Sequence, residues 1–228
     1  MSSLHHANLL AVPFENLDIH LGRPIELDER HLFEKIVASR RGGFCYELNG
    51  LFAWLLRELG FQVDLLSAEV FEGGTFSPEF DHLALRVSME ADWLADVGFG
   101  DSFIRPLSLN PDGAQVQNGR AYRIEQDSKY RVLAQRDESG KWEPFYRFTL
   151  KPRKLQNYQD RCRYHQTSPE SHFTQKRVCT RLTEEGRLTL RDRRLIETRN
   201  GQRQEMQISS EAEYLLALEQ HFGIRLPG

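Results

Sequence analysis

The apolar pattern of this chain changes its period near Gly60, and this change constrains the fold more than any other feature. Before that glycine, apolar residues recur at helical spacing, in the run Leu48, Leu51, Phe52, Leu55, Leu56 and Leu59. After it, Phe61, Val63 and Leu65 alternate with polar residues, which is the pattern of a half-buried strand. The sequence therefore predicts an α+β protein in which helices come first and a sheet follows.

The part of the chain after residue 61 contains a series of short predicted strands. They are expected at residues 82–87, 93–97, 121–126, 130–134 and 142–150. Many short strands without long helices predict a barrel-like sheet. Residues 151–169 are expected to form a connector. Further strands are expected at 177–182, 186–190 and 195–199, and a closing helix at 210–222.

Cys45 lies in the stretch Arg41-Gly42-Gly43-Phe44-Cys45-Tyr46-Glu47, where the main predicted helix begins. The first turn of a helix has unpaired N–H groups and a dipole that favours an anion, so we expect this thiol to ionise more easily than usual. The two glycines are expected to let the backbone turn tightly. A lone cysteine is more commonly a buried core residue. A catalytic role therefore depends on finding partners downstream.

His82 and Asp96 are the predicted partners of Cys45. If residues 82–87 and 93–97 form a hairpin centred on Met89, His82 lies directly opposite Asp96 with Cβ atoms about 5 Å apart. A slip of one residue would put them on different faces. A carboxylate opposite an imidazole holds it in one tautomer. The three residues together predict a nucleophile, a base and an orienting acid.

Composition narrows the class of protein. Lys and Arg number 30 against 33 Asp and Glu, a net charge of −3, so no overall basic surface indicates a nucleic-acid partner. The chain has three cysteines without metal-like spacing, which favours a reducing cytosol and no metal site. No apolar run reaches about 18 residues and no signal-peptide pattern is present, so a cytoplasmic protein without a membrane span is expected. The pair His5-His6 is expected on a helix surface.

Three motifs stand in order along the chain: Pro13-Phe14-Glu15-Asn16-Leu17-Asp18, Arg41 to Glu47, and Trp93-Leu94-Ala95-Asp96-Val97-Gly98-Phe99-Gly100. Together they resemble the arylamine N-acetyltransferase family, which includes bacterial N-hydroxyarylamine O-acetyltransferases. Weaker similarity continues through residues 145–148 and 164–173, so the resemblance covers nearly the whole chain. It implies Cys45 as the acyl-accepting nucleophile, His82 as the base and Asp96 as the orienting residue.

The resemblance also implies an architecture and a reaction. Residues 1–60 would form a helical bundle that carries the nucleophile, 61–165 a β-barrel domain that carries His82 and Asp96, and 166–228 a small α/β lid, in a cysteine-peptidase-like layout. The reaction would move an acetyl group from acetyl-CoA through a Cys45 thioester to an arylamine, hydrazine or N-hydroxyarylamine, with ping-pong kinetics. The enzyme would be a monomer or homodimer. Two alternatives are a cysteine hydrolase with the same triad and a shortened, non-catalytic homologue that binds CoA or an aromatic ligand.

Further site residues are predicted in two groups. Glu15 and Arg41 are expected to pair beneath the active site and fix the turn that presents Cys45, against the alternative of two unrelated surface charges. The expected contacts to CoA are Gly73, Gly74, Thr75, Gly98 and Gly100, although Gly73-Gly74 is equally typical of an ordinary turn. The resemblance implies Tyr164 and Ser171 as further CoA contacts. The expected contacts to the acceptor are Phe14, Phe44 and Phe99; Phe99 could also be a core residue, and the resemblance favours the contact. Gly98 and Gly100 would let backbone approach a ligand closely.

The N-terminal segment is short for the resembled family. Members normally carry further helical residues before the first motif, and here only Met1 to Val12 precede it. Its apolar stripe is too brief for a stable isolated helix. We therefore expect Phe33 and Val37 to be more exposed than in full-length relatives. The chain is expected to be either an early truncation of a longer reading frame or a less stable enzyme with a looser triad.

Overall fold

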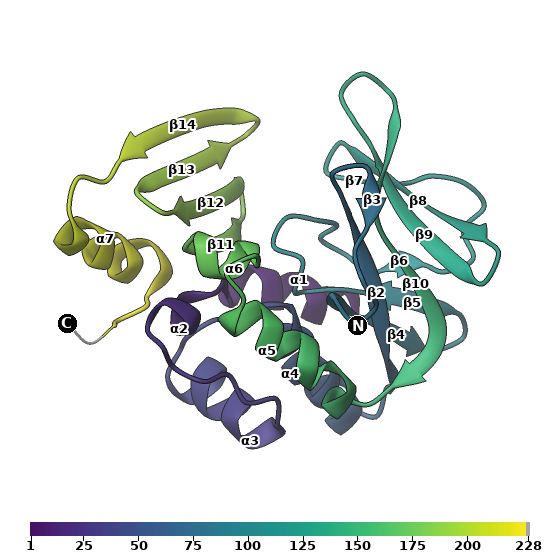
Figure 1. Cartoon of the computed structure of the whole chain (residues 1–228). Coiled ribbons are helices and arrows are strands. Elements are labelled where there is room, and N and C mark those ends of the chain that lie inside the picture. The colour runs from purple at the N-terminus through teal and green to yellow at the C-terminus, as the bar shows by residue number, and fades with distance from the viewer. Residues whose placement is uncertain (227–228) are drawn as a thin grey trace.

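The structure is a computed structural model that describes residues 1–226, and it begins with helices (Figure 1). They are α1 (Ser2–Ala11), α2 (Leu17–His20), α3 (Glu29–Leu32), the π-helical turn η1 (Phe33–Ala38) and α4 (Cys45–Glu58). Helix α4 ends where expected, because Gly60 adopts a left-handed φ of +87° that other residues rarely take. The exposed fractions of Phe33 and Val37 are 43% and 49%.

The strands after α4 form a nine-stranded antiparallel sheet. They are β2 (Gln62–Glu72), β3 (Thr75–Phe76), β4 (His82–Ser88), β5 (Asp92–Ala95), β6 (Leu107–Ser108), β7 (Gln115–Gln117), β8 (Arg120–Asp127), β9 (Tyr130–Arg136) and β10 (Trp142–Arg153). Their order is β6-β5-β4-β2-β10-β9-β8-β7, with β3 paired to β2. The side chain of Gln115 links the two end strands: it accepts from the Ser108 N–H at 2.7 Å and donates to the Ser108 carbonyl at 3.1 Å. The sheet is therefore nearly closed, as the barrel prediction requires.

A second sheet of five strands lies at the other end of the molecule (Figure 1). It consists of β1 (Phe14–Glu15), β11 (Val178–Thr183), β12 (Gly186–Arg191), β13 (Arg194–Arg199) and β14 (Gln202–Gln207), in that order. Helix α7 (Glu211–Ala217) and the turn η3 (Leu218–Phe222) pack on it through Tyr214 and Leu218. Because β1 pairs with β11, the first 60 residues and the last 60 share a sheet. The domain boundaries at 60 and 165 stay a prediction.

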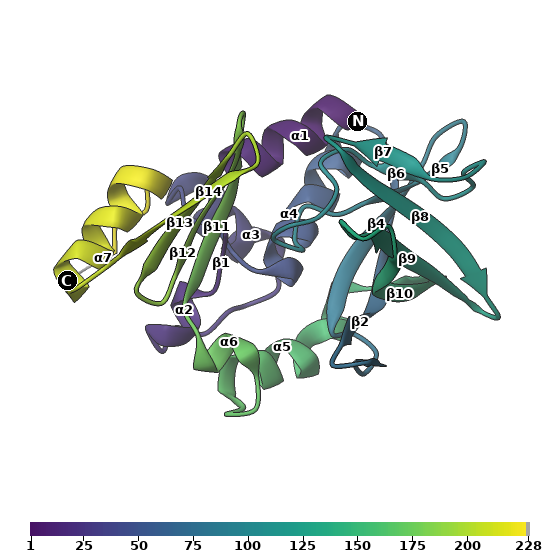
Figure 2. The same ribbon diagram turned by 90° about the horizontal axis from the view of Figure 1, so that it is seen from above.

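The expectation of a connector over residues 151–169 is wrong. Strand β10 continues to Arg153, and the chain then forms the 3₁₀ turn η2 (Leu155–Tyr158), α5 (Gln159–Thr167) and α6 (His172–Gln175). Helix α5 was not predicted because it is mostly polar and buries only Cys162 and His165. Figure 2 shows α5 and α6 beside each other between the two sheets, with α1 at the opposite edge.

The main core lies where α4 packs on β2 and β4. Phe52, Leu56, Leu83 and Leu85 are completely buried there. Burying one such side chain stabilises the fold by roughly 1.5–3 kcal/mol, so this contact holds the start of α4 firmly against the strand that begins with His82. Within residues 1–226, none of the helices has the length and apolar content needed to cross a bilayer.

Candidate active site

Cys45 is the first residue of α4, and the two glycines before it are required by close packing. A Cβ on Gly42 would lie 2.0 Å from the carbonyl oxygen of Pro13, and a Cβ on Gly43 would lie 2.7 Å from the Cβ of Glu47. Neither glycine has a left-handed φ; the residue that does is Arg40, at +50°. The expected reason for the two glycines, a tight turn, is therefore wrong. The chain at Pro13 and Glu15 packs directly against Gly42, and the Glu47 side chain of α4 packs directly against Gly43.

The structure brings Glu15 and Arg41 together beneath this segment. The Arg41 guanidinium donates to Oε1 of Glu15 at 2.7 and 2.9 Å and to Oδ1 of Asp18 at 3.1 Å. Glu15 is completely buried, and its other oxygen accepts from the Leu17 N–H at 2.7 Å. Both oxygens of the buried Glu15 carboxylate therefore accept hydrogen bonds, which offsets the cost of taking this charge out of water.

Lys35 extends this ion pair into a network that reaches the start of α4. Its ammonium lies 2.8 Å from Asp18 and 2.7 Å from Glu47. Burial opposes the charged form, but Glu47 and the other carboxylates outweigh it and raise the pKa of Lys35. Glu47 in turn accepts from the backbone N–H of Phe44, the residue before Cys45. The turn that presents the thiol is therefore held by alternating charges, of which the sequence indicated only the first two.

The imidazole of His82 is bound to the carboxylate of Asp96. Nε2 of His82 lies 2.7 Å from Oδ2 of Asp96, and both side chains are almost completely buried. The expected register of their hairpin is wrong, because Ser88 pairs with Asp92 and the turn is centred on Glu90 instead of Met89. The shift moves the partner position by two residues, so His82 and Asp96 keep the same face.

Three further groups hold the Asp96 carboxylate, and none of them was predicted. Asn49 donates to Oδ1 at 2.8 Å, the Gly98 N–H donates to the same oxygen at 2.9 Å, and the Tyr146 hydroxyl donates to Oδ2 at 3.1 Å. Burial alone would raise the pKa of Asp96, but His82, Asn49 and Gly98 outweigh it and lower the pKa. The carboxylate therefore stays ionised and fixed in orientation.

Cys45 and His82 line one cavity of about 290 Å³. Its lining also includes five of the predicted contact residues: Phe14, Gly98, Phe99, Tyr164 and Ser171. The Phe99 ring lies 5.2 Å from the His82 ring at 85°, edge to face. The backbone of Gly98 packs so closely on α4 that a Cβ there would lie 2.8 Å from the Cα of Cys45. The loop after Asp96 is therefore pressed against the thiol-bearing helix.

Five predicted contact residues lie outside the lining of this cavity. Gly73 and Gly74 form the β2–β3 turn with φ of +61° and +85°, and Thr75 follows them, while Glu72 and Ser77 on either side do line the cavity. Gly100 has a φ of +89° and lies beyond Phe99. Phe44 is completely buried and packs edge-on against Tyr46 at 5.0 Å, which is the environment of a core residue.

The expectation that Cys45 ionises easily is not met in the free protein. Burial raises the pKa of the thiol well above its usual value; the Leu83 N–H opposes this, whereas the charges of Asp81 and Asp96 add to it. Desolvation is the largest of these effects. Removing the thiol proton therefore requires a base inside the same cavity, and His82 is placed there with its Nε2 already taken by Asp96.

A second histidine–carboxylate pair lines the cavity and was missed in the sequence. Nε2 of His165 lies 3.0 Å from Oδ1 of Asp81, and its Nδ1 lies 3.1 Å from Oγ of Ser171. Arg161 donates to the same Asp81 oxygen at 2.6 Å. Although burial opposes it, bonding to His165, Ser77 and Arg161 lowers the pKa of Asp81 to about 2. This cluster ties α5 and α6 to the residue directly before His82.

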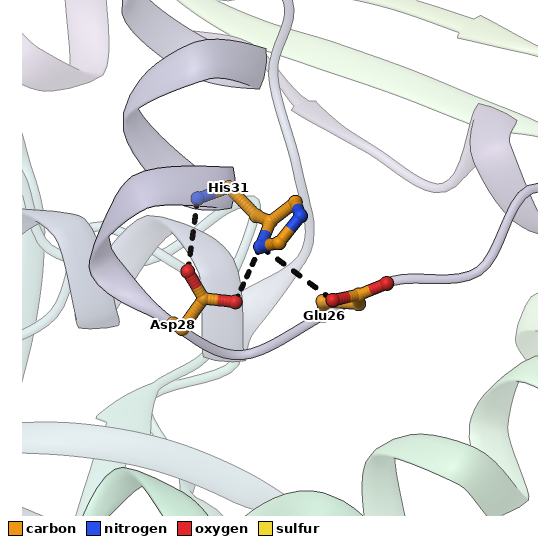
Figure 3. Close-up of side chains that lie close together, drawn as sticks. All are labelled: Glu26, Asp28 and His31. Atoms are coloured by element: carbon orange, nitrogen blue, oxygen red, sulfur yellow. Dashed lines mark hydrogen bonds and ion pairs between the residues drawn. The ribbon is translucent and has the colours of Figure 1, made fainter.

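One group of acidic and histidine side chains lies away from the cavity, at the start of α3 (Figure 3). Asp28 is the N-cap residue and accepts from the His31 N–H at 3.1 Å and from Nδ1 of the same residue at 2.5 Å, and Glu26 lies 3.5 Å from that nitrogen. The bond to Asp28 raises the pKa of His31. Helix capping accounts for this arrangement.

Comparison with known proteins identifies the family. The model of a family described as N-acetyltransferase matches residues 1–228. The chain is 36% identical over 224 residues to the arylamine N-acetyltransferase of Mycolicibacterium smegmatis, a match that covers 95% of this chain and 81% of that protein. This chain belongs to the arylamine N-acetyltransferase family.

Solved structures of arylamine N-acetyltransferases have the same fold. The enzyme of Salmonella typhimurium superimposes with a TM-score of 0.92 at 33% identity, over 100% of this chain and 84% of that one. The enzyme of Mycobacterium marinum, solved in complex with CoA, gives 0.89 at 29% identity, over 98% and 85%. The predicted α+β class and the predicted acyltransferase activity are thereby confirmed for this N-acetyltransferase.

Proposed function

We propose that this N-acetyltransferase carries the acetyl group on Cys45 and transfers it with His82 and Asp96 as base and orienting acid. The observation that supports this most is the 2.7 Å contact between Nε2 of His82 and Oδ2 of Asp96. Because Nε2 is used in that contact, Nδ1 of the ring is the nitrogen available to act as a base in the cavity that Cys45 also lines. A nucleophile, a base and a fixed carboxylate in one buried site are the parts that acyl transfer requires.

In the first half-reaction, Nδ1 of His82 takes the thiol proton as the sulfur of Cys45 attacks the carbonyl carbon of acetyl-CoA. The bond from that carbon to the CoA sulfur breaks, and the CoA thiolate takes the proton back from the imidazolium. Asp96 stabilises the transient positive charge of the ring. The N–H groups at the start of α4 are suited to bind the developing oxyanion. An acetyl thioester on Cys45 remains.

In the second half-reaction, an arylamine, hydrazine or N-hydroxyarylamine attacks that thioester. His82 accepts the proton of the attacking nitrogen or oxygen, and the thiol of Cys45 is regenerated. Because CoA leaves before the acceptor reacts, the kinetics are ping-pong. Phe14 and Phe99 on the cavity wall offer faces to a flat aromatic ring, whereas Phe44 is enclosed in the core and is not an acceptor contact.

The size of the cavity limits which part of acetyl-CoA enters. About 290 Å³ is at the low end for a small-molecule site, so the acetyl group and the end of the pantetheine arm occupy it and the nucleotide lies outside. Tyr164 and Ser171 lie on the wall, and the Gly73-Gly74-Thr75 turn lies just beyond it, at a position suited to phosphate groups. The exposed backbone N–H groups of a turn suit an anion.

The test is intact-mass analysis after incubation with acetyl-CoA alone. One acetyl adduct per chain, mapped to Cys45 and discharged by an added arylamine, is expected. Cys45→Ala is expected to fold normally and to show no adduct and no CoA release. Rapid CoA release without any acceptor would indicate a cysteine hydrolase instead, and a folded chain that binds CoA without forming an adduct would indicate a non-catalytic homologue.

A further inference from the structure

His5 is completely buried, contrary to the expectation that it lies on a helix surface. It belongs to α1, which lies against the loop between β5 and β6. Its ring stacks on Phe103 with centroids 5.7 Å apart and planes at 14°, and meets Phe52 of α4 edge-on at 5.9 Å. Packing between these two aromatic rings restricts the imidazole to one orientation. A polar ring enclosed in this way needs partners for both of its nitrogens.

Both nitrogens of His5 bind backbone, and the two partners stand at opposite ends of one loop. Nδ1 lies 3.1 Å from the carbonyl oxygen of Ile104. Nε2 accepts from the N–H of Asp96 at 3.2 Å and also lies 3.1 Å from the Asp96 carbonyl oxygen. The neutral tautomer with its proton on Nδ1 satisfies both a donor and an acceptor: it donates to Ile104 and accepts from Asp96. A single side chain thus joins residue 96 to residue 104.

The loop between those ends carries much of the candidate active site. It contains the Asp96 carboxylate bound to His82, the Gly98 N–H that donates to that carboxylate, and Phe99 beside the His82 ring. Residues 96–106 form no helix or strand, so no sheet ladder fixes the backbone of Asp96. The side-chain oxygen of Asn49 accepts from the next backbone N–H, that of Val97, at 2.9 Å. Nε2 of His5 accepts in the same way from the backbone N–H of Asp96.

We propose that His5 is a positioning residue of the acetyl-transfer site, which fixes the backbone of Asp96 and so the direction from which its carboxylate meets His82. Burial lowers the pKa of His5 to about 4, which keeps the ring in the neutral form that the two backbone partners need. The inference depends on the proposed function, because it assigns His5 an effect that reaches Cys45 only through Asp96 and His82. The proposal gives helix α1 a role in positioning the catalytic groups, in addition to its packing on the core.

The test compares three substitutions of His5 in the whole chain. His5→Phe keeps the ring between Phe103 and Phe52 but removes both hydrogen bonds. His5→Gln places an amide oxygen where Nε2 accepts from Asp96, and His5→Asn places an amide nitrogen where Nδ1 donates to Ile104. His6→Phe, next along α1 and partly exposed, is the matched control. Each variant is measured for melting temperature, for kcat and KM of acetyl transfer, and for the pH dependence of Cys45 alkylation by iodoacetamide.

A positioning role predicts a specific pattern. His5→Phe should lower kcat about tenfold or more with little change in KM, because small misplacements of catalytic groups are costly. The midpoint pH of Cys45 alkylation should rise by about one unit, since a misdirected carboxylate stabilises the His82 imidazolium less. His5→Gln should recover most of the activity and the normal midpoint, and His5→Asn should not. His6→Phe should behave like the parent.

Two outcomes would overturn the proposal. One is a His5→Phe variant with a lower melting temperature but the parental kcat and alkylation midpoint, which would make His5 a purely structural residue. The other is that His5→Gln and His5→Asn have the same kcat and the same alkylation midpoint. Asp96→Asn in the same assays separates this proposal from the proposed function: if Asp96→Asn changes nothing, the triad assignment itself fails, whereas if only His5→Phe changes nothing, the role of His5 alone fails.

Discussion

His82 and Asp96 are bonded through Nε2 and Oδ2 at 2.7 Å although they do not face each other across the strands. In the register of β4 and β5, Leu85 pairs with Ala95, so continuing the ladder would place Gly98 opposite His82. Asp96 stands one residue beyond the end of β5 and reaches His82 diagonally from the same face. The contact therefore depends on the groups that hold Asp96 as much as on the sheet.

Asp96→Asn should reduce kcat/KM for acetyl transfer by at least about 100-fold while the protein stays folded. An amide cannot stabilise the imidazolium, and it favours the wrong tautomer of His82. Asp101→Asn is the matched control, because Asp101 lies in the same loop and pairs with Arg120 and Arg187 instead of His82. The rate of CoA release measures the activity of both variants. A loss of less than tenfold, about 1.4 kcal/mol in the barrier, would show that Asp96 is not the orienting residue.

The order of helices and strands was predictable from sequence wherever an element buries one face. Helix α4 and strands β2, β4 and β8 to β13 lie within a few residues of their expected ranges, because their apolar residues follow one period. Strand β14 was missed because all six of its residues are exposed and five are polar, so it carries no alternating pattern. It forms by pairing with β13, and its edge position demands no apolar face.

The candidate site was predictable only where a motif marks it. Cys45, His82, Asp96 and the pairing of Glu15 with Arg41 were predicted, and the structure bonds His82 to Asp96 and Arg41 to Glu15. Asn49, Tyr146 and His5 act on Asp96 from positions 47, 50 and 91 residues away. Nothing local in the sequence links residues so distant, and only the tertiary packing brings them into contact.

Gly42→Ala should destabilise the fold strongly. The added Cβ would lie 2.0 Å from the Pro13 carbonyl, which belongs to backbone and cannot move without shifting β1. We expect a loss of about 3 kcal/mol, at the upper end for overpacking, with a lower melting temperature and loss of activity. Gly73→Ala is the control: its Cβ would meet nothing within 4 Å, and only the left-handed φ of +61° opposes it. Equal melting temperatures for the two variants would contradict this account of the Arg-Gly-Gly segment.

Arg41→Met should also be costly, for an electrostatic reason. It leaves the carboxylate of Glu15 buried without its partner, and breaking a buried pair from one side costs about 3–5 kcal/mol. Arg30→Met removes an exposed partner of Glu34 in an i,i+4 pair and should change the stability very little. Urea unfolding of both variants at neutral pH measures the difference. If Arg41→Met costs no more than Arg30→Met, the network beneath Cys45 does not stabilise the fold.

Although Glu47, whose pKa burial raises to about 7, contributes in the opposite direction, the contribution of His5 to the stability of the protein should fall between pH 6.5 and pH 4. The pKa of His5 is about 4 in the folded state against 6.5 for an ordinary histidine, so within this range the unfolded chain binds a proton that the folded protein does not. Above pH 6.5 both states are neutral and the effect vanishes. At pH 5 it amounts to about 2 kcal/mol. Burial is the main cause of this downward shift; the hydrogen bond to Ile104 and the charge and backbone of Asp96 oppose it, and His6 adds to it. Urea unfolding at pH 7.5 and pH 5 should show a smaller pH-dependent loss for His5→Phe than for the parent, and an equal loss in both would refute the assignment.

Limiting iodoacetamide should alkylate Cys45 before Cys162 and Cys179, and the preference should depend on His82. Burial raises the pKa of all three thiols, so an intrinsically acidic thiol is not the reason. Cys45 differs because it shares a cavity with an imidazole that can take its proton, whereas Cys162 accepts a hydrogen bond from the Gln166 amide at 3.2 Å. Peptide mapping after partial alkylation should find the label on Cys45 in the parent protein and slow, unselective labelling in His82→Ala. If His82→Ala keeps the parental preference, Cys45 reacts through exposure alone, and His82 is not the base that activates it.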